Sequence, residues 1–127
     1  MEELMSQMVR GVKSRYSYEE TVERIKSKTR ELGWSVIGEH DLAEKVGVKL
    51  TIIEVCNKEF AKRALEMPED RWISAFMPCH FAVVENPDGV YVYGINMGLF
   101  GRFMPERLGR ILMDVSKVDE EILKSIT

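Results

Sequence analysis

Two alternating runs joined by a short turn constrain the fold of this 127-residue chain more than any other stretch. Residues 79–85 (CHFAVVE) and 90–95 (VYVYGI) are rich in strand-forming residues. Between them, residues 86–89 (NPDG) are typical of a turn, and Gly89 can take the positive φ that such turns often need. The pattern predicts a β-hairpin. Strand alternation places three apolar or aromatic side chains of the second run on one side: Tyr91, Tyr93 and Ile95.

Three more stretches, residues 9–16, 34–42 and 48–56, are also expected to form strands. In the second, alternation puts His40 on the apolar side with Trp34, where we expect a histidine that is half-exposed or has its hydrogen bonds satisfied. In the third, Glu54 interrupts an apolar side, which indicates either a strand edge or a polar pocket.

The expected helices are marked by their ends. Ser17 and Glu20 form a capping box ahead of apolar residues at helical spacing, and Gly33 follows the last of them. Asn57 can cap a second helix that ends before residue 68. A third is expected from Pro105, and Asp119 is expected to cap a separate short helix at the end of the chain.

Strands joined as hairpins, with helices between some of them, predict an α+β fold in one domain over residues 1–127. We expect a single curved antiparallel sheet of about five strands with helices packed on one face. The tyrosine side of the hairpin then needs a cover of its own: a loop, a ligand or a second subunit. We therefore expect a homodimer.

Charge and hydropathy exclude several classes of function. The net charge of −3 and pI near 5.5 argue against a nucleic-acid partner. No run of roughly 18 apolar residues is present, so no membrane span is expected. The first residues lack the pattern of a signal peptide, which predicts a cytoplasmic protein with reduced cysteines. Few amides among many charged residues suggest a thermophile.

Cys56, Cys79 and His80 are the candidate ligands for a soft metal such as zinc, copper(I) or iron. Neighbours in a regular strand point to opposite faces, however, so Cys79 and His80 bind one ion only if Pro78 holds them outside the strand pairing. The spacing of the cysteines matches no zinc pattern. No metal or cofactor is assigned, and two buried structural cysteines are the alternative.

A thiol pair is a second hypothesis for the same cysteines. Neighbouring strands could bring the Cα atoms of Cys56 and Cys79 within about 7 Å, the limit for a disulfide. Cys56 also precedes the helix expected after Asn57, whose dipole would lower a thiol pKa. A Cys79–His80 catalytic pair is a third hypothesis, but the spacing indicates no acid or amide partner for it.

Residues 99–104 (LFGRFM) mix aromatic and basic side chains. Phe100 and Arg102 are the candidate ligand-binding residues here, since such a segment could contact an anionic ligand, a membrane surface or a partner chain. The alternative is a lid over the core of the domain itself.

Several short motifs together resemble the domain of unknown function 302 family. They are Cys56-Asn57, then Ala64-Leu65-Glu66 with Pro68, then Pro78-Cys79 leading into Val83-Val84. Three positions depart from the family pattern: Lys58 in place of proline, His80 in place of asparagine, and Asn96-Met97 in place of Asp-Pro.

The resemblance implies a β-α-β(4)-α fold with helices on one side of a curved antiparallel sheet. It carries over no established activity, but it draws attention to Cys56 and Cys79.

The leading functional prediction is a homodimeric module that binds a small, partly apolar ligand or a soft metal, in a pocket between the hairpin and residues 96–104. One alternative is a thiol-redox or sulfur-handling enzyme that uses Cys79 and Cys56. Another is a structural assembly subunit. The sequence assigns neither a reaction nor a ligand.

Overall fold

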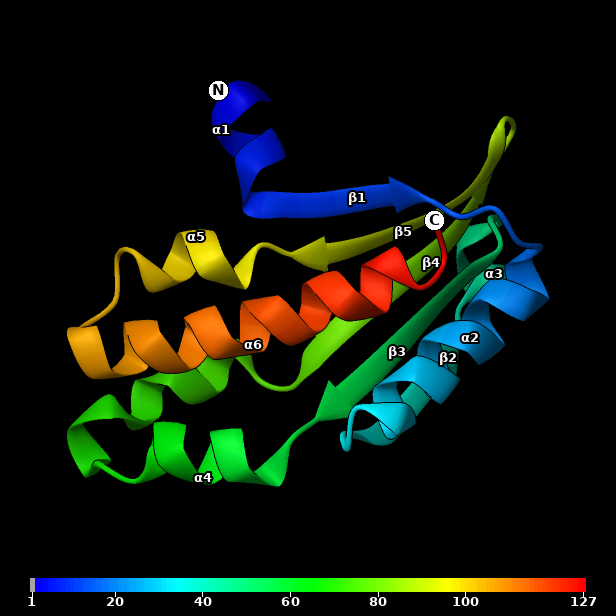
Figure 1. Ribbon diagram of the computed structural model, residues 1–127. Coiled ribbons are helices and arrows are strands. Elements are labelled where there is room, and N and C mark those ends of the chain that lie inside the picture. Colours follow the sequence, from blue (N-terminus) through cyan, green and yellow to red (C-terminus); the bar gives the residue numbers. More distant parts are fainter. Residues whose placement is uncertain (1) are drawn as a thin grey trace.

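The computed structural model describes residues 2–127, and it forms one open sheet with helices (Figure 1). No helix in this part of the chain is long and apolar enough to cross a membrane. The elements in chain order are α1 (Glu2–Met8), β1 (Val9–Lys13), α2 (Tyr18–Glu31), β2 (Ser35–Asp41), α3 (Ala43–Val46), β3 (Leu50–Cys56), α4 (Lys58–Leu65), the 3₁₀ helix η1 (Pro68–Phe76), β4 (Cys79–Asn86), β5 (Gly89–Ile95), α5 (Met97–Gly101) and α6 (Glu106–Lys124).

The five strands form a single antiparallel sheet in the order β1-β5-β4-β3-β2. The predicted hairpin is β4–β5, and β4 is the central strand. Its turn closes with Asn86 paired to Gly89, whose φ of 146° lies in the region that favours glycine. Helices α2 and α6 lie against one face, while α4, η1 and α5 gather at one end of the sheet (Figure 1). The predicted α+β fold is confirmed.

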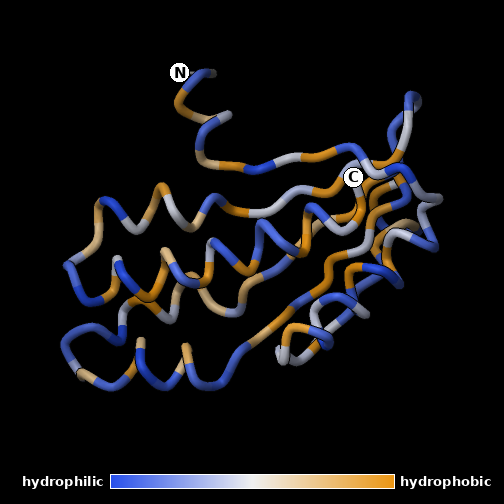
Figure 2. The backbone as a smooth tube through the Cα atoms, in the orientation of Figure 1, coloured by the Kyte–Doolittle hydropathy of each residue, from blue (hydrophilic) through white to orange (hydrophobic). Residues whose placement is uncertain are grey.

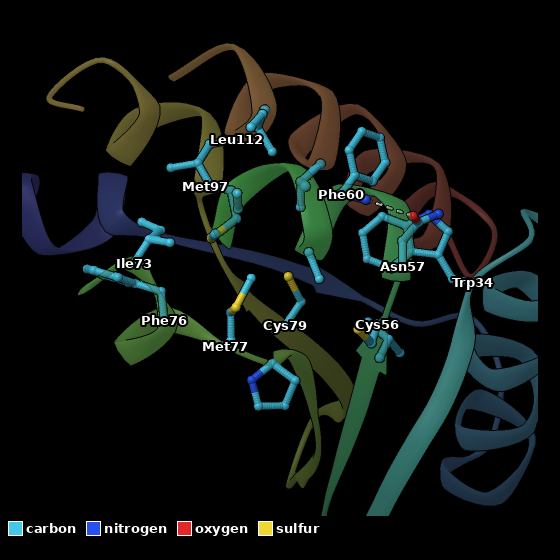
Figure 3. Close-up of a pocket in the computed structure, with 16 residues that line it drawn as sticks. Trp34, Cys56, Asn57, Phe60, Ile73, Phe76, Met77, Cys79, Met97 and Leu112 are labelled. Atoms are coloured by element: carbon cyan, nitrogen blue, oxygen red, sulfur yellow. Dashed lines mark hydrogen bonds between the residues drawn. The ribbon is translucent and has the colours of Figure 1, made fainter. Parts of the chain in front are cut away.

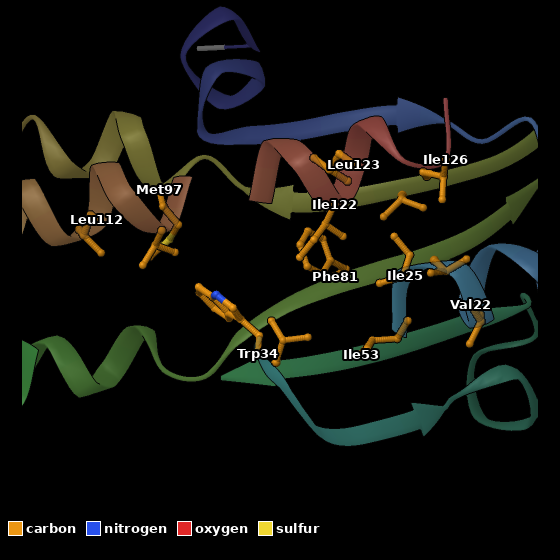
Figure 4. Packing of buried hydrophobic residues seen from close by; sticks show 14 of the residues in the cluster. Val22, Ile25, Trp34, Ile53, Phe81, Met97, Leu112, Ile122, Leu123 and Ile126 are labelled. Carbon is orange, nitrogen blue, oxygen red and sulfur yellow. The ribbon is translucent and has the colours of Figure 1, made fainter. Parts of the chain in front are cut away.

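Strand alternation builds the core. On β3 and β4 every second side chain faces the helices, and Ile53, Val55, Phe81 and Val83 are at most 1% exposed there. Residues of α2 and α6 meet them from the other side (Figure 4), including Ile25 and Ile122. The apolar stretches of the chain follow the central strands and the inner sides of these helices (Figure 2). Each fully buried aliphatic side chain contributes about 1.5–3 kcal/mol.

The predicted helix starts are present. The Ser17 hydroxyl accepts a hydrogen bond from the Glu20 backbone N–H at 3.2 Å. The Asn57 side-chain oxygen accepts from the Glu59 and Phe60 N–H groups at 2.9 and 3.1 Å. Each cap supplies an acceptor that a helix N-terminus otherwise lacks.

The predicted position of His40 is wrong, because β2 contains a bulge. The β2–β3 register shifts between Val36 and Gly38, and this reverses the alternation along the rest of the strand. Val36 therefore pairs with the buried Val55, whereas His40 pairs with Ile52 on the face away from the helices. The exposed His40 ring places Nε2 2.6 Å from a Glu54 carboxylate oxygen on that same face.

The end of the chain also differs from the prediction. Helix α6 runs without a break from Glu106 to Lys124, and Asp119 lies inside it rather than at a helix start. Asp119 belongs to the stripe that contains Val115 and Ile122, at the i+4 and i−3 positions, so it faces the sheet. The side chain is only 6% exposed.

No helix among residues 2–127 covers the second face of the sheet (Figure 1). As predicted, Tyr91, Tyr93 and Ile95 share this face, opposite Val84 and Ala82 of β4. The rings of Tyr91 and Tyr93 stack with centroids 6.2 Å apart and planes 7° apart. We call this the open face.

Candidate functional site: an apolar cavity at the end of the sheet

An apolar cavity of about 100 Å³ lies where β3 ends and β4 begins (Figure 3). The Asn57 cap turns the chain from β3 into α4, and one side of that helix supplies Phe60, Ala61 and Ala64. Helix α6 supplies a second wall and η1 a third. The two alanines matter because short side chains leave space between helices that larger residues would fill.

Aromatic rings surround this space. Trp34, just before β2, packs on Phe60 with ring centroids 5.8 Å apart. Phe76, at the end of η1, lines the cavity and packs from its other side on Phe100 at 5.7 Å. The cavity is partly open to solvent and its surface is almost wholly apolar. Such a site favours an apolar guest, since it offers few hydrogen-bond partners for water.

Cys79 opens β4 on the side that faces the helices, and its thiol lies in the cavity wall (Figure 3). Burial raises the pKa of this thiol to about 12, with smaller contributions in the same direction from the nearby Asp119 carboxyl and Cys56. Cys79 is therefore a neutral thiol at neutral pH. A neutral thiol is a poor nucleophile, so the environment of Cys79 gives little support to thiol chemistry.

Cys56 ends β3 directly after Val55, the residue that pairs with Cys79. The two cysteines thus lie on neighbouring strands, as the sequence led us to expect, and both line the cavity. Both are free thiols. The thiol-redox hypothesis stays a prediction.

The other candidate residues lie outside the cavity. His80 is exposed on the open face, where it pairs with Glu54. Phe100 packs on Phe76, and Arg102 lines a separate, more polar groove beside Arg10. Within residues 2–127, no group of three or more His, Cys, Asp or Glu side chains is arranged to hold a metal ion.

Sequence reasoning missed two kinds of residue. Met77 and Met97 line the cavity beside the cysteines, but methionine in an apolar stretch carries no pattern that separates a cavity wall from ordinary core. Asp119 could have been found, because it occupies a core position of a helical repeat. Its Oδ1 is buried without a hydrogen-bond partner among the described residues. Burial raises the pKa of Asp119 to about 7, and the positive charge of Arg10 opposes that rise.

The profile of the family described as domain of unknown function DUF302 matches residues 10–126, nearly the whole chain. The chain belongs to the DUF302 family. The predicted resemblance is confirmed and extends beyond the motifs that suggested it, through α6. No curated protein matches this DUF302 chain.

A solved structure has the same fold. The crystal structure of an uncharacterized conserved protein DUF302 from Bacillus stearothermophilus superimposes with a TM-score of 0.84 at 23% sequence identity. The match covers 94% of this chain and 98% of that one.

Proposed function

We propose that this DUF302 protein is a binding module whose cavity takes a small apolar compound, or the apolar end of a larger one. The almost wholly apolar lining carries this proposal. At about 100 Å³ the space is smaller than the engineered cavity of roughly 150 Å³ that binds benzene, so it limits the guest to a single small ring or a short branched hydrocarbon, part of which can extend through the open side. Trp34, Phe60 and Phe76 would supply the aromatic contacts.

Toluene is a suitable probe, followed by the indole N–H signal of Trp34 in two-dimensional NMR. A Trp72→Phe background removes the other tryptophan, which is 49% exposed and does not line the cavity. We expect saturable shifts with a Kd of about 1 mM or tighter, as ligand efficiencies of small apolar molecules suggest.

The matched variants add the same side chain in two places. Ala61→Leu fills the cavity and should abolish the shifts, whereas Ala43→Leu on α3, outside the cavity, should leave them intact. Shifts that do not saturate, or that survive Ala61→Leu, would refute binding in the cavity.

We also propose that the open face joins two copies of the chain into a homodimer. The stacked Tyr91 and Tyr93, with Ile95 and Val84, form a surface on the sheet that the helices of residues 2–127 leave uncovered. A second copy offers the same surface, and a two-fold axis makes such a surface self-complementary. Free Cys56 and Cys79 suit a reducing compartment such as the cytoplasm.

Light scattering tests the dimer. Tyr93→Asp places a charge in the proposed interface and should give monomers, whereas Tyr93→Phe should leave the dimer intact. A monomeric wild-type protein, or a dimeric Tyr93→Asp variant, would overturn this interface.

A further inference from the structure

Four of the sulfur atoms in the chain gather around one cavity. They belong to Cys56, Met77, Cys79 and Met97, and they come from three separate parts of the sequence. Met77 and Cys79 flank Pro78 immediately before and at the start of β4, while Met97 is the first residue of α5. The fold, rather than a local motif, brings them together.

Three of these side chains point into the same part of the cavity. In Figure 3 the sulfur-bearing ends of Met77 and Cys79 lie side by side, and the side chain of Met97 reaches toward them from the opposite wall. Met97 is only 7% exposed. In Figure 3, Cys56 ends β3 on the far side of Cys79 from Met77, and it also borders a second pocket beside Gly33.

We propose that Met77, Cys79 and Met97 form a three-sulfur site that binds one Cu(I) ion. This inference rests on the proposed function, because the copper site lies in the cavity proposed for the apolar ligand. Copper and that ligand would either occupy the cavity together or compete for it.

The ligand types favour this ion. Thioether and thiolate sulfurs are soft ligands that select Cu(I), whereas Zn²⁺ and Fe²⁺ take nitrogen or oxygen donors or several thiolates. Among residues 2–127 the cavity wall has no imidazole and no carboxylate, and the nearby Asp119 carboxyl lies outside that wall.

Charge balance gives a second reason. Cu(I) displaces the proton of the Cys79 thiol, which passes to solvent, and the sulfur–copper bond replaces the sulfur–hydrogen bond with no change in oxidation state. The product, one thiolate, one monovalent ion and two neutral thioethers, carries no net charge. A neutral complex can lie in an apolar cavity without the cost of a buried charge, whereas a divalent ion on the same ligands would leave one positive charge uncompensated.

Anaerobic titration with Cu(I) against the chelator bicinchoninate tests the site on the full chain. We expect one copper per chain for the wild type. Met77→Leu and Met97→Leu keep the volume and the apolar surface but remove a ligand, so each should weaken Cu(I) binding at least about tenfold, since loss of even an outer-shell partner costs that much. Cys79→Ser should abolish binding. Cys56→Ser is the matched control and should bind Cu(I) as the wild type does.

The outcomes separate this site from the apolar-ligand proposal. Toluene binding should survive both Met→Leu substitutions, because leucine preserves the cavity wall. Absence of Cu(I) binding with toluene binding intact would overturn the copper site alone. Equal Cu(I) binding by Met77→Leu, Met97→Leu and wild type would show that the thioethers are not ligands. Loss of binding in Cys56→Ser together with wild-type binding in Cys79→Ser would overturn the assignment of Cys79. Thermal unfolding of each variant checks that a loss of binding is not a loss of the fold.

Discussion

Asp119→Asn should change the pH dependence of stability between about pH 4 and 8. The carboxyl lies between α6 and the sheet, 6% exposed, with one oxygen that has no partner among residues 2–127. Its pKa rises from the model-peptide value of 3.8 to about 7, chiefly because burial disfavours the charged form. The folded protein thus keeps a proton that the unfolded chain has already lost.

The sign follows from proton binding. Between pH 3.8 and about 7 the folded state binds more protons at Asp119 than the unfolded state does, so the free energy of unfolding falls as the pH rises. Below this window both states are protonated, and above it both are ionised and the loss is constant. The gap between the two pKa values corresponds to about 4 kcal/mol, of which about 3 kcal/mol falls between pH 4.5 and 8.

Urea unfolding of the metal-free protein at a series of pH values, followed by circular dichroism, measures this loss. An asparagine carries no charge at any pH, so the difference in unfolding free energy between Asp119→Asn and the wild type should move in favour of the variant by about 3 kcal/mol from pH 4.5 to 8. Other titrating groups cancel in this difference. A buried amide without full hydrogen bonding lowers the variant's absolute stability by about 1–3 kcal/mol at every pH, which leaves the slope unchanged.

Asp114→Asn is the control, since Asp114 lies on the same helix with its side chain partly in solvent. We expect this variant to follow the wild-type profile. Parallel profiles for Asp119→Asn and the wild type would refute the reasoning, because they would mean that Asp119 is ionised in the folded protein at every pH tested.

Three further substitutions or measurements test other parts of the structure. Gly109→Ala should destabilise the protein by about 1–3 kcal/mol in urea unfolding, because an added Cβ would lie 2.6 Å from the Gly101 carbonyl oxygen where α5 and α6 touch; an unchanged midpoint would mean that the helices can separate freely. Ser17→Ala should cost about 1 kcal/mol through loss of the helix cap, and Ser17→Asp should restore most of it. In a Cys56→Ser background, Cys79 should react with Ellman's reagent at pH 7.5 far more slowly than an exposed cysteine, since burial raises its pKa to about 12. Rapid reaction of the folded protein would instead favour the thiol-redox hypothesis.

Local patterns predicted most of the architecture. The alternating runs around residues 86–89 were sufficient to predict the central hairpin. They also predicted that Tyr91 and Tyr93 share a side, since residues two positions apart in a strand point to the same face. The caps at Ser17 and Asn57 were also readable, because a cap is a contact between residues two or three positions apart. The predictions failed where contacts with residues far along the chain changed the alternation of a strand or the end of a helix.

His40 shows the limit for strands. A one-residue bulge in β2 reversed the side to which His40 points. Gly38, at the register shift, is the local signal for it, since a glycine inside a strand often marks a bulge. Asp119 shows the limit for helices. The sequence favours a helix start at Asp119, because burying a carboxyl group without a hydrogen-bond partner costs free energy. Only the packing of the rest of α6 offsets that cost.

The sequence by itself determined the family, the hairpin, the helix starts and the placement of Cys56 and Cys79 on neighbouring strands. The tertiary structure alone decided that Met77 and Met97 lie with Cys79 around one apolar cavity, and that His80, Phe100 and Arg102 do not line it. The physical reason is one of distance along the chain. A strand or a cap depends on nearby residues. This cavity, in contrast, forms where the ends of β3 and β4 contact α4, η1, α5 and α6, and contacts between such distant segments cannot be predicted from a local pattern.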